Sequence, residues 1–429
     1  MNSGGSESVG YFSPYLWQIM LNTTLLFGLI LFTGFIGGEL AKLVKLPKVT
    51  GYIVAGIFLN PGLFGIVPVE FNNNTDVLTN VALSFITFSV GGSLLFPKIK
   101  KMGRGILYIT LFEAEFAFLL TAGGLLVFFY FFNPFPDASF YAVFLPAALL
   151  LGALASPTDP SATLAVRSEF KADGPVMATI MAVAAFDDVL GIINYSLATA
   201  VAMALISQES MAFETVLDPF ISIGGAVALG IAYGLLLNFV TGKVKKEEDS
   251  VLLVILAGIL LLTFGTANLL HVDELLATMT VGVMVVNYNP RTEIIFRVLE
   301  RYTDEIIFTL FFTISGLKLN FESLNSGYWL VAAFIVLRFA GKALGVFTGG
   351  ALAHSPKKIR RYVTGGLFPQ GGIVIGLALI MSQNPAFSKF SDFILNVVLG
   401  ATIIHELFGP VAAKISLKKA GEIKATDSH

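Results

Sequence analysis

The chain of 429 residues is 55% hydrophobic and only 13% charged, whereas about 25% of the residues in an average soluble domain are charged. With a mean hydropathy of +0.80 and a net charge of −2, it is not an ordinary soluble domain and shows no sign of a nucleic-acid partner. The absence of cysteine excludes disulfides, thiolate metal sites and cysteine chemistry. The composition therefore predicts an all-α polytopic membrane protein embedded in a lipid bilayer.

About 20 apolar residues cross the hydrocarbon core of a bilayer as a helix. On this measure the sequence divides into a polar N-terminal tail at 1–13, a membrane transporter domain at 14–415 and a C-terminal tail at 416–429. The membrane domain contains about thirteen predicted transmembrane helices. Their approximate centres are Leu26, Ile57, Ile86, Phe118, Gly152, Leu190, Val227, Gly258, Thr280, Leu310, Leu337, Val374 and Leu399.

The positions of lysine and arginine predict which ends of these spans face the cytoplasm. Basic residues cluster after the odd-numbered spans, for example at 98–104 after the third span and at 357–361 after the eleventh. The loops after the even-numbered spans carry almost no lysine or arginine. Because the cytoplasmic loops of membrane proteins are enriched in these residues, we expect the N-terminus outside and the C-terminus in the cytoplasm.

Two of the predicted spans contain sequences that interrupt a helix. The fifth span holds "ASPTDPSAT" at 155–163, and the twelfth holds "FPQGGIVIG" at 368–376. Proline removes a helical hydrogen bond and clashes with the preceding turn. Unwound backbone at membrane depth survives only where it is buried in protein or lines a wet cavity. Two breaks at corresponding places in the two halves therefore indicate a transport site rather than simple kinks.

The two breaks lie seven spans apart, and so does a second pair of similar segments. The segment "FSVGGSLLF" at 88–96 ends the third span and resembles "FTISGLKLN" at 312–320, which ends the tenth. An odd offset makes the two copies cross the membrane in opposite directions. The sequence therefore predicts an inverted-topology repeat, about 14–205 and 250–415, with a linking helix at about 215–241 and two crossed broken helices.

Two adjacent aspartates, Asp187 and Asp188, lie inside the apolar sixth span, where each charge costs about 2.5–3.5 kcal/mol. Neighbours on a helix point about 100° apart, so one can pair with a fixed cation while the other faces a cavity. Lys342 on the eleventh span is the switchable partner, because a buried ammonium can lose its proton. We predict that Lys342 pairs with Asp187 and that Asp188 binds the transported cation.

The unwound part of the fifth span supplies further oxygen atoms to this predicted site. Thr158, Asp159 and free carbonyls would complete an oxygen cage for a monovalent metal cation, although Asp159 could instead cap the half-helix after Pro160. Desolvation favours the protonated form of a carboxylate, whereas a nearby ammonium favours the ionised form. A carboxylate balanced between these effects binds either a proton or a cation, and this competition is an exchange mechanism.

The other charged residues within the spans are interpreted mainly as structural. Arg338 shares a helix face with the lysine of the eleventh span and is expected to pair with Glu113 or Glu115. Pairing of Arg338 with Asp187 stays open. Glu406 in "HELFGP" is expected near the cytoplasmic end of the last span, as a helix-end or ion-pairing residue.

Four segments carry a family resemblance: "FDDVLGI" (186–192), "FAGKALGVF" (339–347), "SVGGSLLFPKIKKMGR" (89–104) and "HELFGPVAAKISLKKAGE" (405–422). They resemble the cation:proton antiporter superfamily, in particular the NapA-like and NhaA-like bacterial sodium/proton antiporters. The resemblance implies that Asp188 binds the ion, that Asp187 pairs with Lys342 and that spans 5 and 12 cross at the site. It also implies a homodimer in the bacterial cytoplasmic (inner) membrane, a core domain that moves like an elevator, and a role in pH homeostasis.

The chain also departs from the NapA-like pattern at both breaks. Its "SPTDPSA" resembles the electroneutral exchanger branch, in which the aspartate pair is replaced by Asn-Asp. Where NapA-like members carry an acid in span 12, this chain reads "PQGG", with Gly372 at that position, and potassium-efflux relatives begin this segment in a similar way. The choice between Na⁺ and K⁺ and the number of protons per cation therefore stay open.

The predicted function is secondary active exchange of Na⁺ (or Li⁺ or K⁺) for H⁺, with no cofactor. A sodium-coupled solute symporter and a K⁺-selective efflux transporter of the same fold are the alternatives. A cation channel is disfavoured because the sequence has no filter-like Thr-Val-Gly-Tyr-Gly loop. An enzyme is not expected, since no motif for a nucleophile, a catalytic metal or a phosphate is present.

Overall fold

The computed structural model describes residues 23–64, 66–68, 75–97, 100, 103–132, 139–207, 213–243, 249–302, 304–319, 321, 327–382 and 384–423, and these residues are almost entirely helical. The expected tail at 1–13 lies outside this part of the chain. A short π-helix (Phe140–Phe144) leads into α8, and a 3₁₀ turn (Pro385–Phe387) precedes α20. The α-helices are α2 (Thr23–Leu43), α3 (Lys48–Leu59), α5 (Asp76–Gly92), α7 (Arg104–Phe132), α8 (Leu145–Leu154), α9 (Pro160–Phe170), α10 (Pro175–Ser207), α11 (Phe213–Lys243), α12 (Asp249–Leu269), α13 (Glu274–Tyr288), α14 (Thr292–Tyr302), α15 (Asp304–Lys318), α17 (Tyr328–Leu352), α18 (Lys357–Gly366), α19 (Gly372–Ser382) and α20 (Ser391–Lys419).

Seven of the described helices are long and apolar enough to cross a membrane on their own, namely α2, α7, α10, α11, α12, α17 and α20. Each of the expected span centres lies within a different helix. The centres of the fifth and twelfth spans fall in α8 and α19, which are only 10 and 11 residues long. The polytopic all-helical class is therefore confirmed, with short half-helices at the two places where the sequence predicts breaks.

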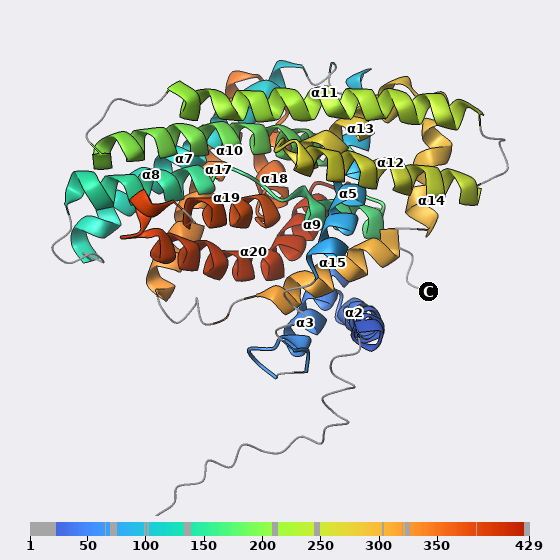
Figure 1. Cartoon of the computed structure of the whole chain (residues 1–429), viewed down its shortest axis with the longest axis horizontal. Coiled ribbons are helices and arrows are strands. Elements are labelled where there is room, and N and C mark those ends of the chain that lie inside the picture. Colours follow the sequence, from blue (N-terminus) through green and yellow to red (C-terminus); the bar gives the residue numbers. More distant parts are fainter. Residues whose placement is uncertain are drawn as a thin grey trace, which may run out of the picture.

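The helices pack into two main apolar cores. One core joins residues of α3, α5, α10, α13 and α15, and the other joins residues of α7, α8, α17, α19 and α20. The long helix α10 contributes its first half to the former core and its second half to the latter. Figure 1 shows α10, α11 and α12 along one side of the molecule, with α2, α3 and α15 together at the opposite side. A helix apolar on all faces, as α10 largely is, can serve two cores in this way.

The two breaks adjoin one another in the middle of the molecule. The first separates α8 from α9 at 155–159, and the second separates α18 from α19 at 367–371. Asp159 N–H donates to the carbonyl of Pro369 at 3.2 Å, and Gln370 Nε2 donates to the carbonyl of Leu154 at 2.6 Å. Each unwound segment therefore supplies hydrogen-bond partners to the other, as backbone polar groups away from water require.

A single arginine on α17 binds both breaks at once. Arg338 is fully buried, and its guanidinium donates to the carbonyls of Ala155 (3.1 Å) and Pro157 (2.8 Å) on the first break. It also donates to the carbonyls of Phe368 (2.8 Å) and Pro369 (3.3 Å) on the second. The planar fork of an arginine can serve several acceptors in this way, whereas a lysine ammonium is a compact point donor.

The expected ion pair between Arg338 and Glu113 or Glu115 is wrong. Glu113 instead forms an ion pair with Lys342, which lies on α17 together with Arg338. Glu115 accepts a hydrogen bond from Asn194 at 3.2 Å. The physical reason is that the carbonyl groups of the unwound segments need a buried hydrogen-bond donor, and Arg338 is that donor. The sequence does not show directly which side chain would meet this need.

We expect Arg338→Lys to destabilise the protein, because a lysine cannot reach all four carbonyls. Leaving buried acceptors without a donor should lower the free energy of unfolding by about 2 kcal/mol. Thermal unfolding in detergent measures this change, with Arg301→Lys on the exposed end of α14 as the matched control. Equal unfolding midpoints for Arg338→Lys and Arg301→Lys would show that Arg338 does not hold the crossing together.

Candidate functional site

A buried lysine lies at the centre of a cluster of polar groups beside the first break. Lys342 Nζ is 2.7 Å from Glu113 Oε2, 3.2 Å from Asp187 Oδ2, 2.9 Å from Thr158 Oγ1 and 2.7 Å from the carbonyl of Ser156. The side chains of Lys342, Glu113 and Asp187 are at most 1% exposed. One ammonium therefore faces two carboxylates away from solvent, so its charge compensates only one of them.

Four separate elements bring this cluster together. Asp187 comes from α10, Lys342 from α17, Glu113 from α7 and Thr158 from the first break. Glycines on α17 let it approach α7 closely, because a Cβ at Gly341 would lie 2.6 Å from the Cα of Ala117. Small residues at helix crossings allow such close backbone packing in membrane proteins. This close packing places the ammonium of Lys342 beside the first break.

The two adjacent aspartates point into different surroundings. Asp187 accepts hydrogen bonds from the hydroxyl of Thr158 (2.5 Å) and from its backbone N–H (3.3 Å), in addition to facing Lys342. Asp188 instead lines a cavity of about 50 Å³, and within the described part of the chain its Oδ1 accepts no hydrogen bond. In the structure one aspartate of the pair is therefore ion-paired and hydrogen-bonded, and the other faces a cavity.

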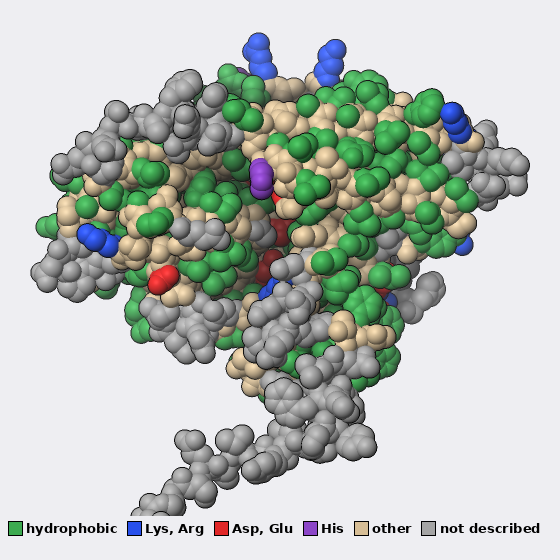
Figure 2. All heavy atoms as spheres, in the orientation of Figure 1, with side chains coloured by type: hydrophobic (Ala, Val, Ile, Leu, Met, Phe, Trp, Pro, Cys, Tyr) green, Lys and Arg blue, Asp and Glu red, His purple; other side chains and the backbone are tan. Residues whose placement is uncertain are grey.

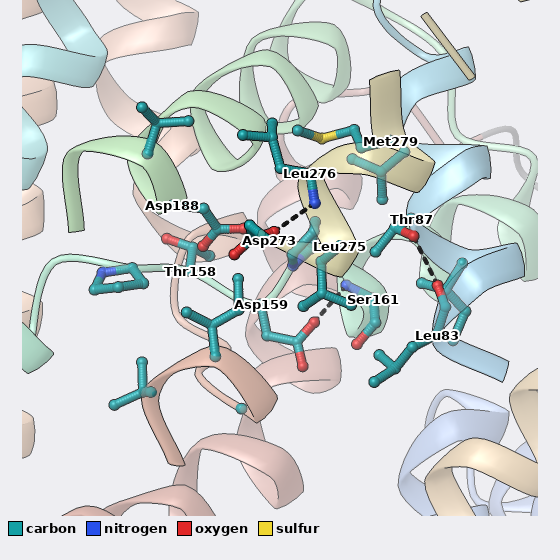
Figure 3. Close-up of a pocket in the computed structure, with 18 of the residues that line it drawn as sticks. Leu83, Thr87, Thr158, Asp159, Ser161, Asp188, Asp273, Leu275, Leu276 and Met279 are labelled. Atoms are coloured by element: carbon teal, nitrogen blue, oxygen red, sulfur yellow. Dashed lines mark hydrogen bonds between the residues drawn. The ribbon is translucent and has the colours of Figure 1, made fainter. Parts of the chain in front are cut away.

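The small cavity has apolar walls and a few polar groups. Asp188, Asp159, Thr158 and Thr87 line it, and Figure 3 shows their side chains around the opening between α5, α10 and α13. The hydroxyl of Thr158 already donates to Asp187 and accepts from the lysine ammonium, so one lone pair of its oxygen is left. A carboxylate, hydroxyl groups and exposed carbonyls are the oxygen ligands that hard cations prefer.

Asp159 caps a half-helix as well as facing the cavity. Its Oδ1 accepts a hydrogen bond from the N–H of Ser161 at 2.8 Å, and Pro160 occupies the first position of α9. This is the usual start of a helix, with an acidic cap followed by proline. The capping alternative is therefore confirmed, while the second carboxylate oxygen of Asp159 remains available for other contacts.

A third aspartate lines the same cavity and is absent from the sequence-based site. Asp273 caps α13 by accepting a hydrogen bond from the N–H of Leu276 at 2.6 Å. Figure 3 shows its side chain near that of Asp188. An acidic residue before an apolar run signals a helix start, but nothing local in the sequence indicates that this start faces the sixth span.

A larger cavity of about 990 Å³ adjoins the small one. The two share Asp273, Gly371 and Ile373, and the larger cavity is also lined by Lys318 and Glu406. Figure 2 shows this face of the molecule hollowed near its centre, with acidic side chains deep in the hollow. The larger cavity thus leads from the surface toward the aspartates.

Glu406 is not the helix-end residue that the sequence suggests. It lies in the middle of α20 and is 5% exposed, next to the second break. Among the described residues it forms no ion pair, and its Oε2 accepts no hydrogen bond. Because α20 continues as one helix to Lys419, Glu406 lies well inside it and is buried.

The chain is similar in sequence to several known cation/proton antiporters. The chain is 26% identical over 286 residues to the Na⁺/H⁺ antiporter NhaP of Pseudomonas aeruginosa, which covers 62% of this chain and 66% of that protein. It is 22% identical over 432 residues to Na⁺/H⁺ antiporter 1 of Methanocaldococcus jannaschii, covering 92% of this chain and 96% of the relative. The match to cation/H⁺ antiporter 15 of Arabidopsis thaliana spans only 47% of that longer protein.

A solved structure shares the fold. The sodium proton antiporter MjNhaP1 of Methanocaldococcus jannaschii at pH 8 superposes with a TM-score of 0.70, covering 94% of this chain and 99% of that one at 19% sequence identity. At that identity the likeness concerns the fold. The family model described as "Sodium/hydrogen exchanger, transmembrane" matches residues 27–418. The chain therefore belongs to the sodium/hydrogen exchanger family, within the cation:proton antiporter superfamily.

Proposed function

We propose that this protein exchanges Na⁺, or Li⁺ or K⁺, for H⁺ at Asp188, across a bacterial cytoplasmic membrane. The observation that carries the proposal is the different partnering of the two adjacent aspartates. Asp187 is ion-paired with Lys342 and hydrogen-bonded by Thr158, whereas Asp188 faces a cavity with an oxygen atom that has no hydrogen-bond partner among the described residues. A buried carboxylate of this kind is stabilised by binding either a proton or a cation.

In this mechanism Asp188 releases its proton when a cation enters the small cavity. The carboxylate then binds the cation, and the oxygen atoms of Thr158, Asp159 and the unwound backbone replace part of its hydration shell. Departure of the cation leaves a desolvated carboxylate, which takes up a proton again. Because the proton and the cation compete for one carboxylate, the two fluxes run in opposite directions.

The same proposal includes the arrangement of the chain in the membrane. The lysine-rich and arginine-rich loops support about thirteen spans with the N-terminus outside and the C-terminus in the cytoplasm. The two helix breaks, seven predicted spans apart, support an inverted repeat around the ion site. The family resemblance supports a homodimer in which the core moves against a dimerisation domain.

A K⁺-selective efflux transporter is the second candidate, and one observation favours it. The second break contains Pro369 and Gln370, and potassium-efflux relatives have a similar Pro-Gln start in this segment. The same assay separates the two, since the ion that collapses a pH gradient identifies the substrate. A solute symporter would not collapse the gradient in response to a cation alone.

We expect Asp188→Asn to abolish cation-for-proton exchange, because an amide neither releases a proton nor binds a cation strongly. The measurement uses the full chain in liposomes with a pH-sensitive dye, an imposed pH gradient and no membrane potential. Na⁺, Li⁺, K⁺ or choline is then added in turn. Asp392→Asn, at the exposed start of α20, is the matched control and should exchange like the unchanged protein.

Exchange at the unchanged rate by Asp188→Asn would remove Asp188 from the mechanism. No response of the unchanged protein to any of the cations would overturn the antiporter proposal itself.

We expect Lys342→Met to lower stability strongly, because it leaves Asp187 and Glu113 buried without a counter-charge. Breaking a buried pair in this way costs about 3–5 kcal/mol. Thermal unfolding in detergent measures the change, and the double variant Lys342→Met with Asp187→Asn should recover part of it, since one uncompensated charge is removed. No recovery in the double variant would show that Asp187 is not the partner that Lys342 stabilises.

A further inference from the structure

The last turn of α9 is bound to two neighbouring elements by polar side chains. Arg167 Nη1 donates to Ser93 Oγ, directly after α5, at 2.6 Å. Lys171, directly after α9, forms an ion pair with Glu300 on α14. Both contacts lie at the end of α9 that the basic loops predict to face the cytoplasm. They tie α9 to α5 and to α14 on that side of the molecule.

A third contact joins the same turn of α9 to α3. Glu169 Oε2 accepts a hydrogen bond from the N–H of Lys48, the first residue of α3, at 2.7 Å. The residue before α3 is Pro47, whose side chain provides no cap. A carboxylate is favourable at such a helix start, because the first N–H groups lack partners and the helix dipole is positive there. Displacement of α9 would therefore leave α3 without its cap.

A cavity of about 280 Å³ adjoins these contacts, between α5, α9 and α14. Arg167, Lys171 and Glu300 line it together with the hydroxyl-bearing residues Ser89 and Ser168. Hydroxyl and carboxylate oxygens are ligands that hard cations accept. The lining thus suits the passage of a hydrated monovalent cation, although the cavity is separate from the exchange site.

This cavity continues the small cavity of the exchange site along the same two helices. On α9, Ser161 lines the small cavity, and Leu164 lines the cavity near the last turn. Three residues rise by about 4.5 Å along a helix. On α5, Val90 lines the small cavity and its neighbour Ser89 lines the other. Leu164 and Val90 are buried in one apolar core, so an apolar layer of about one helical turn separates the two cavities.

The opposite side of the exchange site is open in the same structure. The cavity of about 990 Å³ reaches Asp273 and Gly371, which also line the small cavity. Its lining includes Asn268, His271 and Lys318, which lie at or after the ends of the eighth and tenth predicted spans. Figure 2 shows the hollow on this face. Because even-numbered spans are predicted to end outside, the wide opening faces away from the predicted cytoplasmic side.

We infer that the cavity between α5, α9 and α14 is the cytoplasmic half of the cation path, and that the last turn of α9 is the gate that closes it in this structure. The inference rests on the proposed exchange function. Opening moves α9 away from α3, α5 and α14, which breaks the contacts of Arg167, Glu169 and Lys171 together. Since Thr158 and Asp159 directly precede α9, the same movement displaces the cation site.

The absence of cysteine from the chain allows a direct test with introduced thiols. The variant Lys171→Cys with Glu300→Cys carries one thiol on each side of the gate, and a bifunctional thiosulfonate reagent links the two thiols reversibly. We expect the linked protein to lose cation-for-proton exchange in liposomes and to regain it after reduction. The matched control is Glu39→Cys with Lys42→Cys, an ion pair within α2 alone, where the same link should leave exchange unchanged.

Unchanged exchange by the linked Lys171→Cys, Glu300→Cys protein overturns the gate and leaves the exchange function in place. The linked protein should still bind radioactive Na⁺ in detergent, because the large cavity stays open. Loss of Na⁺ binding on linking would also overturn the gate, since the link would then act on the cation site itself. Absence of exchange by the unchanged chain overturns the exchange function instead, so the two failures are distinguishable.

A single variant tests the path itself if the cysteine pair does not fold. Ser89→Cys carries a thiol in the cavity between α5, α9 and α14. In inverted membrane vesicles with Na⁺ present, a membrane-impermeant cationic thiol reagent should block its exchange from the cytoplasmic face. Val127→Cys, on an outer face of α7 that is 58% exposed, is the control and should keep exchange. No loss of exchange by Ser89→Cys, or a loss only in right-side-out vesicles, would overturn the cytoplasmic path.

Discussion

Unwound backbone in a membrane interior needs hydrogen-bond partners, and the centre of this protein is organised by that requirement. The two breaks supply partners to each other, and Arg338 supplies the donors that they lack. Because the breaks are held in this way, the side chains of Thr158 and Asp159 can face a cavity. Ordinary helices would have used the carbonyls of these segments internally and left nothing to offer an ion.

The second constraint is the cost of burying charge. Lys342 lies within ion-pair distance of both Asp187 and Glu113 and so offsets part of the cost of burying them. Asp188, next to Asp187 in the chain, lines the cavity. The adjacency of the two aspartates on one helix is what separates their roles, since α10 directs them to different sides. The neighbouring residues Asp187 and Asp188 thus provide an ion-paired carboxylate and a carboxylate that faces the cavity.

Much of this arrangement follows from local sequence. Prolines predict the breaks, apolar length predicts the spans, and the aspartates stand out because acids are rare inside spans. The partners of Arg338, the buried position of Glu406 and the approach of Asp273 to the cavity could not be predicted in the same way. Each depends on which helices meet in three dimensions, and a single sequence carries no direct record of such contacts.

The way Arg338 is held has a consequence for ion leakage. Its guanidinium binds four neutral carbonyl oxygens, and none of its described hydrogen bonds goes to a carboxylate, so its charge is not cancelled by a close ion pair. In an environment of low dielectric constant, an uncancelled positive charge repels a nearby cation strongly. We expect this charge to oppose the passage of a partly dehydrated metal ion across the crossing of the two breaks. On this view, the residue that secures the unwound backbone also opposes a continuous pore through it.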